Sequence, residues 1–167
     1  WDSQWAVGTE APPLWPELAG ATLGILGFGH IGQALDRRAA AFEMRVCAVR
    51  QRAQAEPPDG VALVGGPDQL DEVLGEADHL AVTLPLTATT RGLLDAGRLR
   101  RLKPSAIVVN VARAEIFDEA ALYEALAAGR IAGAALDVWY RYPAAPGPAR
   151  PATQPFEMRD NVLLTPH

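Results

Sequence analysis

Three glycines spaced as G-x-G-x-x-G, from Gly27 to Gly32, limit the fold of this sequence more tightly than any other pattern in it. The motif directly follows the apolar stretch Ala21–Leu26 and opens a segment of helical period. In a strand–turn–helix unit the first glycine permits a tight turn, the second lets the backbone approach a pyrophosphate, and the third lets the helix pack close to the strand. The helix N-terminus offers its free N–H groups to the phosphates. The motif therefore predicts a dinucleotide site that includes Gly27, Gly29, His30, Ile31 and Gly32.

Short apolar runs alternate with stretches of helical period along the rest of the chain. Strands are expected at Ala21–Leu26, Val46–Val49, Val61–Val64, Leu80–Leu84, Ile107–Val111, Ile131–Val138 and Val162–Leu164. The first helix is expected to pack through a face that holds Ile31, Leu35, Ala39 and Phe42. A later helix over 119–128 has Asp118 as its N-cap and Gly129 just past its end. This βαβ order, with strands that lack strict alternation, predicts an α/β fold: a Rossmann-type doubly wound parallel sheet with helices on both faces.

The two ends of the chain differ from this regular pattern in composition. Residues 1–18 are rich in Trp and Pro, and we interpret them as an N-terminal arm that precedes a dinucleotide-binding domain over 19–167. Residues 139–160 contain five prolines and predict a long functional or interfacial loop. A domain of this size could not easily cover the tryptophans of the arm, so the sequence predicts a homodimer.

Charge and cysteine content exclude several classes of protein. The net charge is −5 and the 15 basic residues are scattered, so the chain lacks the basic stripe of a nucleic-acid binder. No apolar run is long enough to span a membrane, and no signal peptide or metal-ligand cluster is visible. Cys47 is the single cysteine, which excludes a disulfide scaffold and favours a reducing, cytoplasmic setting.

The end of the second expected strand indicates which cofactor is preferred. An NAD site usually has an acidic residue there, where it holds the ribose hydroxyls. This sequence has Arg50 and Arg52 instead, and no acid occurs before Glu56. Two guanidinium groups can bind a 2′-phosphate, so NADP is favoured over NAD. The alternative is that both arginines are ordinary solvated loop residues.

Ordered motifs continue through the second half of the chain. They are Val82–Thr87 with Thr90–Leu93, Leu102–Pro104, Val109–Arg113, Asp118–Leu122, Gly133–Val138 and Asn161–His167. With the glycine motif, they resemble the nucleotide-binding domain of the D-isomer-specific 2-hydroxyacid dehydrogenases over residues 19–167. The resemblance implies an NAD(P)-dependent oxidoreductase that transfers hydride between nicotinamide and a small D-2-hydroxyacid/2-ketoacid pair.

The resemblance also implies roles for individual residues. Arg113 matches the arginine that holds the substrate carboxylate and polarises the keto oxygen, a task that suits a planar guanidinium. Asp137 matches the acid that orients the nicotinamide carboxamide. His167 matches the histidine that exchanges a proton with the substrate hydroxyl. Further cofactor contacts are implied for Leu84, Pro85, Thr90, Val111 and Ala112, in addition to Arg113.

Two departures from the family pattern leave the function open. The glutamate that usually supports the histidine stands five residues after the aspartate, and that position holds Tyr142 here. A phenol can form a hydrogen bond but brings no charge. In addition, the substrate domain of the family is missing, so the chain by itself is expected to bind cofactor without catalysis. The alternatives are a formate dehydrogenase-like enzyme, which also has a neutral residue there, and a non-catalytic nucleotide-sensing module.

Overall fold

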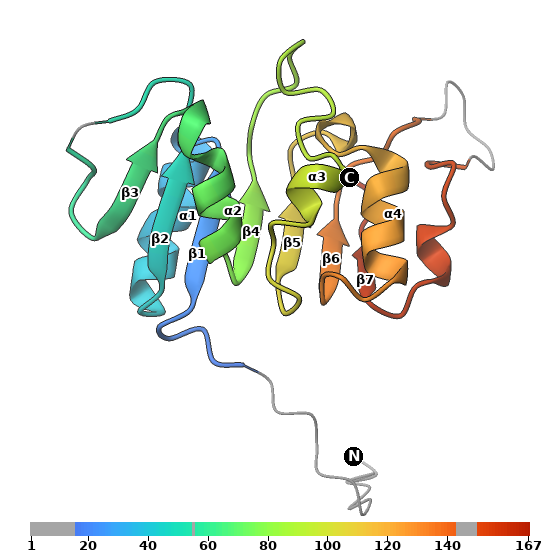
Figure 1. The fold of residues 1–167 in the computed structure, drawn as a ribbon, viewed down its shortest axis with the longest axis horizontal. Coiled ribbons are helices and arrows are strands. Elements are labelled where there is room, and N and C mark those ends of the chain that lie inside the picture. Colours follow the sequence, from blue (N-terminus) through green and yellow to red (C-terminus); the bar gives the residue numbers. More distant parts are fainter. Residues whose placement is uncertain (1–15, 55, 143–149) are drawn as a thin grey trace, which may run out of the picture.

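A single sheet of seven parallel strands forms the centre of the molecule (Figure 1). The computed structural model describes residues 16–54, 56–142 and 150–167. Most of the predicted arm and residues 143–149 of the proline-rich loop therefore lie outside the described residues. The strands are β1 Thr22–Leu26, β2 Arg45–Val49, β3 Val61–Gly65, β4 His79–Val82, β5 Ile107–Asn110, β6 Gly133–Leu136 and β7 Val162–Leu164. Their order in the sheet is β3-β2-β1-β4-β5-β6-β7.

Within the described residues, four α-helices pack against this sheet, one on one face and three on the other (Figure 1). They are α1 His30–Ala41, α2 Leu70–Glu76, α3 Ala96–Leu99 and α4 Glu119–Ala127, and the short 3₁₀ turns are η1 Pro67–Gln69, η2 Ala114–Ile116 and η3 Phe156–Met158. Helix α1 covers one face, and α2, α3 and α4 cover the other. The predicted Rossmann-type doubly wound sheet is confirmed.

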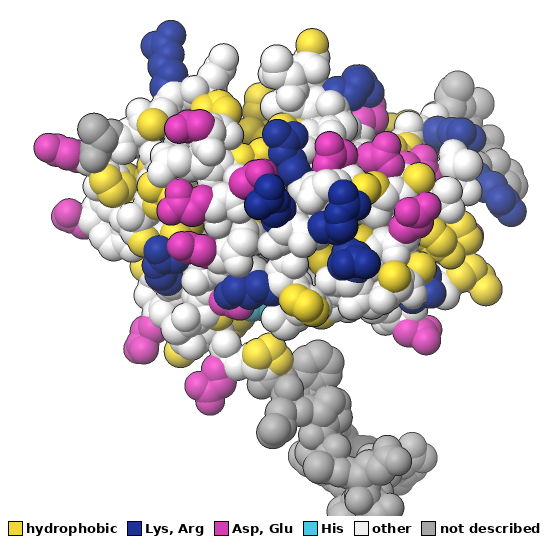
Figure 2. Space-filling view, in the orientation of Figure 1, with side chains coloured by type: hydrophobic (Ala, Val, Ile, Leu, Met, Phe, Trp, Pro, Cys, Tyr) yellow, Lys and Arg dark blue, Asp and Glu magenta, His cyan; other side chains and the backbone are white. Residues whose placement is uncertain are grey.

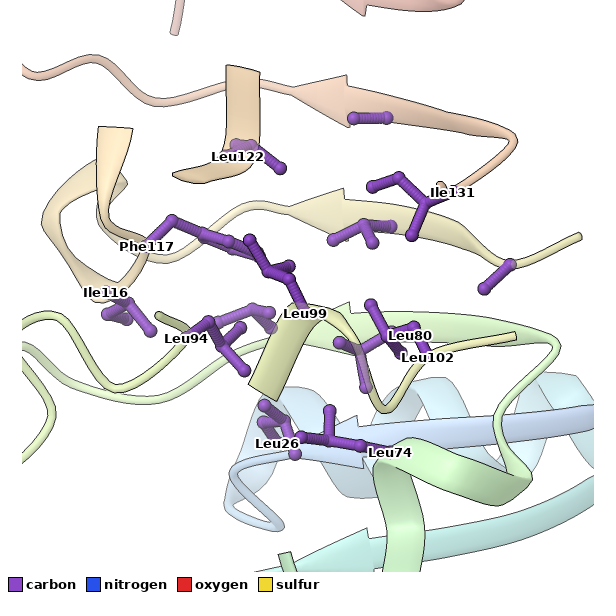
Figure 3. Packing of buried hydrophobic residues seen from close by; sticks show 14 of the residues in the cluster. Leu26, Leu74, Leu80, Leu94, Leu99, Leu102, Ile116, Phe117, Leu122 and Ile131 are labelled. Atoms are coloured by element: carbon purple, nitrogen blue, oxygen red, sulfur yellow. The ribbon is translucent and has the colours of Figure 1, made fainter. Parts of the chain in front are cut away.

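The larger apolar core lies between the sheet and the face that carries α2, α3 and α4. In Figure 3, Leu74, Leu99 and Leu122 extend from these three helices toward strand residues such as Leu26 and Leu80. A smaller core beneath α1 includes Leu23, Ile25, Phe28 and Val46. Because apolar side chains on both faces of the strands are buried, the strands read as continuous apolar runs rather than as alternating ones.

The ends of α4 show how local sequence sets the limits of a helix. The Asp118 carboxylate accepts a hydrogen bond of 2.8 Å from the Ala121 N–H, as the predicted N-cap should. Gly129 has a φ of 61°, a left-handed conformation that favours glycine and ends the helix. The predicted strands were too long at Leu80–Leu84 and Ile131–Val138. The first ends at Val82, and the last bond of its ladder to β1 runs from the Thr83 N–H to the Leu26 carbonyl at 2.8 Å.

The predicted packing face of α1 is wrong at both ends. Ile31 is 61% exposed and Phe42, which follows the helix, is 58% exposed. The buried residues of α1 are Gly32 and Ala39, which are spaced seven residues apart and so share a face. A glycine occupies the position nearest the sheet, and Ile31, one residue earlier, is rotated away from it.

Half of the α1 face of the sheet is sparsely covered. The buried cluster on this face extends from β3 to Ala81 in β4 and no further. Beyond it, among the residues that the structure describes, Ile107, Val109 and Ala135 are only half-buried, and Leu163 in β7 is 65% exposed. The prediction of helices on both faces therefore holds fully for the β3–β4 half of the sheet.

The surface over α2, α3 and α4 mixes both signs of charge. Figure 2 shows Lys and Arg side chains interspersed with Asp and Glu across this face, without a continuous basic stripe. No helix in the described part of the chain is both long and apolar enough to cross a bilayer.

Asp78 ties together three strands at the amino edge of the sheet. Its carboxylate accepts hydrogen bonds from the Thr22 N–H at 2.9 Å and from Lys103 Nζ at 2.7 Å. Asp78 directly precedes β4. Its N–H donates to the Thr22 carbonyl at the start of β1, and its carbonyl accepts from the Ile107 N–H at the start of β5. Burial raises the pKa of the Asp78 carboxyl, but the bonds from Lys103 and Thr22 outweigh that effect and hold the pKa below its usual 3.8.

We predict that Asp78→Ala lowers the free energy of unfolding by about 1–2 kcal/mol, because a backbone N–H and an ammonium lose their acceptor. Lys103→Met removes one of these bonds and should cost less. Because the pKa of Asp78 is lowered on folding, its contribution is present above about pH 4 and is lost as the pH falls through the folded-state pKa. Urea unfolding at neutral and acidic pH measures this; equal stability of Asp78→Ala and wild type at neutral pH would contradict it.

Candidate functional site

The carboxyl ends of the strands form the candidate site, where the strand order reverses between β1 and β4. In open parallel sheets this reversal creates a crevice that binds ligands. A cavity of about 900 Å³ lies here. It is lined by Leu26 to Gly29 after β1, Val49 to Arg52 after β2, Pro67 and Leu70 near α2, and Leu84, Pro85, Thr87, Thr89, Thr90, Leu93 and Arg98 beyond β4.

The three glycines of the motif occupy three different environments. Gly27 has a φ of 105°, and a Cβ there would lie 2.9 Å from the backbone of Thr83 and Leu84. A Cβ on Gly32 would lie 2.3 Å from the Gly27 carbonyl oxygen. A Cβ on Gly29, by contrast, would meet no atom within 4 Å. The first and third glycines are therefore needed by the fold itself, whereas the second faces open space in the cavity.

Thr83 holds the glycine turn in place. Its Oγ1 donates a hydrogen bond of 2.7 Å to the Gly27 carbonyl, and the Gly27 N–H donates to the Val49 carbonyl at 2.9 Å. These bonds link the turn to both neighbouring strands. Sequence reasoning missed Thr83; the available signal was a polar residue directly after an apolar strand.

The N-terminus of α1 has the properties of an anion site. Gly29 is its N-cap and supplies no side-chain hydrogen bond, and the first turn contains no acidic residue. The N–H groups of His30, Ile31 and Gly32 precede the first bond within the helix, which runs from the Gln33 N–H to the Gly29 carbonyl. Free N–H groups, the helix dipole and an open glycine together fit the pyrophosphate of a dinucleotide.

Two predicted arginines line the same cavity. Arg50 and Arg52 follow β2, and neither forms a salt bridge to any described residue; Arg50 has only a 3.4 Å contact with Gln54 Oε1. Arg98 of α3 lines the cavity as well and was not predicted, because a helix of four residues has no readable period. It lies 3.8 Å from Asp71, so its charge is partly offset.

The loop after β4 forms another wall. Leu84, Pro85 and Thr90 line the cavity, as predicted for cofactor contacts. The Thr90 hydroxyl donates to the Pro85 carbonyl at 2.7 Å and accepts from the Thr87 N–H at 2.8 Å. Thr90 therefore shapes the wall through bonds within its own loop.

A second group of predicted residues follows β5. Asn110, 1% exposed, accepts a hydrogen bond from the Ala112 N–H and donates one to the Arg113 carbonyl, both at 3.1 Å. These bonds fix the turn from Val111 to Arg113. The Arg113 guanidinium donates to the Ala112 carbonyl at 2.6 Å and forms no salt bridge to any described residue. Glu115, the nearest acid in sequence, pairs with Arg91 instead.

The ends of β6 and β7 complete this group. Asp137 accepts a hydrogen bond from the Thr165 hydroxyl. The Tyr142 hydroxyl lies 2.8 Å from His167 Nδ1. The structure thus brings residue 142 to the histidine, as counting from Asp137 predicted. No cluster of His, Cys, Asp and Glu suited to a metal ion occurs within the described ranges.

The predicted site residues thus form two neighbouring sets at one edge of the sheet. The first set lines the cavity: Gly27, Gly29, Arg50, Arg52, Leu84, Pro85 and Thr90. The second set lies outside its lining, at the start of α1 or after β5, β6 and β7: His30, Ile31, Gly32, Val111, Ala112, Arg113, Asp137, Tyr142 and His167.

Comparison with known families agrees with this geometry. Residues 2–167 match the family model described as D-isomer specific 2-hydroxyacid dehydrogenase, NAD binding domain. The chain belongs to this family. Among its relatives, the glyoxylate reductase of Pyrococcus furiosus is 40% identical over 169 residues, which cover 100% of this chain and 45% of that protein. The chain thus spans less than half the length of that dehydrogenase.

Solved structures of the dehydrogenase family superpose on the chain. The D-isomer specific 2-hydroxyacid dehydrogenase of Xanthobacter autotrophicus Py2, in complex with NADPH and MES, has a TM-score of 0.78 and 37% identity and covers 91% of this chain and 46% of its own. The NADPH-dependent glyoxylate/hydroxypyruvate reductase of Sinorhizobium meliloti, in complex with NADP and sulfate, has a TM-score of 0.77 and 33% identity, covering 91% and 47%. It is the NAD-binding domain of this family that residues 2–167 match.

Gly29→Ala and Gly32→Ala are a matched pair that separates binding from folding. Gly32→Ala should destabilise the domain by about 1–3 kcal/mol, because its Cβ overlaps the Gly27 carbonyl. Gly29→Ala should leave the unfolding midpoint nearly unchanged and weaken nucleotide binding, because its Cβ enters the cavity. Thermal unfolding and fluorescence titration with NADPH measure the two effects. The assignment fails if Gly29→Ala binds NADPH like wild type.

Proposed function

We propose that this domain binds NADP(H) and serves, in the complete enzyme, the reduction of a small 2-keto acid to the D-2-hydroxyacid. The observation that carries the proposal is Arg113, an exposed guanidinium without a carboxylate partner among the described residues. It follows β5 at the same edge as the glycine turn, and Asp137 and His167 follow the next two strands of the sheet.

The preference for NADP(H) is supported by the end of β2. Arg50 and Arg52 line the cavity and are free of salt bridges within the described residues, and no acid stands where NAD sites place one. Guanidinium groups bind phosphate through charge-assisted hydrogen bonds. The relatives from Xanthobacter and Sinorhizobium were solved with NADPH and NADP.

In this proposal each chemical task is assigned to particular groups of the chain. Bound nicotinamide would supply or accept a hydride. The free N–H groups at the start of α1 hold the pyrophosphate, and Asp137 orients the carboxamide. Arg113 binds the substrate carboxylate and polarises the keto oxygen. His167 exchanges a proton with the substrate oxygen.

The substrate class is proposed from the relatives and the residues together. A glyoxylate reductase of 40% identity and the Sinorhizobium glyoxylate/hydroxypyruvate reductase both act on small 2-keto acids. The guanidinium of Arg113, which has no carboxylate partner among the described residues, can bind the one carboxylate of such a substrate. The predicted homodimer and cytoplasmic location stay predictions; the tryptophans that motivated the dimer, Trp1, Trp5 and Trp15, lie outside the described residues.

We predict that NADPH binds at least tenfold more tightly than NADH, since charge-assisted bonds to a phosphate contribute about 1.5–3 kcal/mol each before desolvation. Arg50→Ala and Arg52→Ala should each reduce this ratio. Arg130→Ala, at the far end of α4, is the matched control and should leave it unchanged. Fluorescence titration of both cofactors measures the ratio; equal affinities in the wild-type domain would overturn the preference.

In the complete enzyme, Arg113→Gln should lower kcat/KM for glyoxylate by roughly 100-fold, because two charge-assisted bonds to the carboxylate are lost. Affinity for NADPH should be unchanged. Arg91→Gln, which loses only its pair with Glu115, is the control. If the wild-type enzyme binds NADPH but reduces no 2-keto acid, the non-catalytic alternative replaces this proposal.

A further inference from the structure

Two groups contact the Tyr142 hydroxyl, and together they restrict where its proton can lie. The Trp139 backbone N–H is 3.1 Å from Tyr142 Oη, and His167 Nδ1 is 2.8 Å from the same oxygen. A backbone N–H can only donate a hydrogen bond, so Tyr142 Oη accepts from Trp139. The phenol has one proton, and its nearest acceptor among the described residues is the imidazole Nδ1.

The Trp139 donor is held in position by a second bond. The indole Nε1–H of Trp139 donates to the Thr165 carbonyl at 3.0 Å. This bond joins the segment after β6 to the segment after β7, two residues before His167. The segments that carry Tyr142 and His167 are therefore joined by a hydrogen bond that is independent of the contact itself. The aromatic rings, with centroids 5.7 Å apart, are tilted at 51° and do not stack.

We propose that Tyr142 holds the neutral imidazole of His167 in the tautomer that carries its proton on Nε2. In this arrangement the Trp139 N–H donates to Oη, and the Tyr142 O–H donates to Nδ1. In the opposite tautomer Oη would receive two N–H donors, and the phenolic proton would have no acceptor in the described chain. A phenol is also a better donor than acceptor, since the ring withdraws electron density from its oxygen.

A carboxylate in this position would have the opposite effect. Ionised glutamate only accepts hydrogen bonds, so it would draw the proton to Nδ1 and leave a lone pair on Nε2. Tyr142 is thus a positioning residue: it acts through His167 and decides which ring nitrogen presents a proton.

The tautomer has a consequence for reaction direction, which rests on the proposed function. With its proton on Nε2, neutral His167 offers a donor to a keto oxygen. It has no lone pair there for the hydroxyl proton of a 2-hydroxyacid, so oxidation requires that the Tyr142 hydrogen bond first break. Reduction takes its proton from the imidazolium, which has one on each nitrogen, so the Tyr142 hydrogen bond disfavours oxidation by the neutral imidazole.

The test is the ¹⁵N NMR spectrum of His167 in this domain at about pH 8, above the ordinary titration range of histidine. Chemical shifts and couplings to the ring protons distinguish the two tautomers. Wild type should show predominantly the Nε2–H form. Tyr142→Phe should reduce the ratio of Nε2–H to Nδ1–H about fivefold, which corresponds to one net hydrogen bond. Tyr142→Glu should make Nδ1–H predominant.

Tyr123→Phe is the matched control, since it removes a phenol that packs on Phe156 away from the site, and its spectrum should equal that of wild type. A predominant Nδ1–H form in wild type, or a Tyr142→Phe spectrum identical to wild type, would overturn the proposal. In the complete enzyme at about pH 8, Tyr142→Glu should raise kcat for hydroxyacid oxidation, because Nε2 of the neutral imidazole then has a lone pair for the hydroxyl proton. Because the spectrum needs no turnover, an inactive enzyme with the expected tautomer would refute only the proposed function.

Discussion

The closest backbone contacts at the site occur where β1 turns into α1, and the remainder of the site depends on them. Gly32 lies directly against the Gly27 carbonyl, and Gly27 lies against the backbone after β4. No side chain fits between these surfaces, so α1 starts at a fixed height above the sheet. The N-cap of α1, Gly29, consequently lies in the lining of the cavity, and the hydroxyl of Thr83 secures the turn from the neighbouring strand. Close packing in this region therefore also fixes the electrostatics. The two glycines allow only one position for the N-terminus of α1, and that position sets the direction of the helix dipole.

Side-chain hydrogen bonds position the other part of the site, which follows β5, β6 and β7. After β5 the chain is shaped by the buried amide of Asn110, which satisfies two backbone groups of the following turn. After β6 and β7, side-chain bonds from Thr165 and Trp139 join the two segments. The glycine turn is thus held by steric fit, and the segments after β5, β6 and β7 are held by hydrogen bonds. The chain has a net charge of −5, yet both parts of the site carry arginines. Arg50 and Arg52 lie in the first part, and Arg113 lies in the second.

The fold and the glycine environments could be predicted because both depend on spacing along strands and helices. The Tyr142–His167 contact followed from the resemblance to the family, by counting from Asp137. Residues that act across the sheet could not be found in this way. Thr83 bonds to the glycine turn because β4 lies beside β1, and Arg98 reaches the cavity because the four-residue helix α3 borders it. Neither arrangement produces a periodic pattern in the sequence. Ile31 was misplaced because the pattern of apolar residues was used without regard to Gly32, whose lack of a side chain defines the true packing face.

The uneven cover of the sheet gives the domain a gradient of local stability. Around β1 both faces are packed, whereas β7 is a three-residue edge strand with Leu163 largely in solvent. Backbone amides in such a strand exchange with deuterium through small local openings, while those of β1 exchange only when most of the domain unfolds. His167 therefore follows an edge segment that opens readily, whereas the glycine turn extends from a strand that is packed on both faces. Nucleotide binding is built on the more rigid of these two strands, and the Tyr142–His167 contact on the more compliant one.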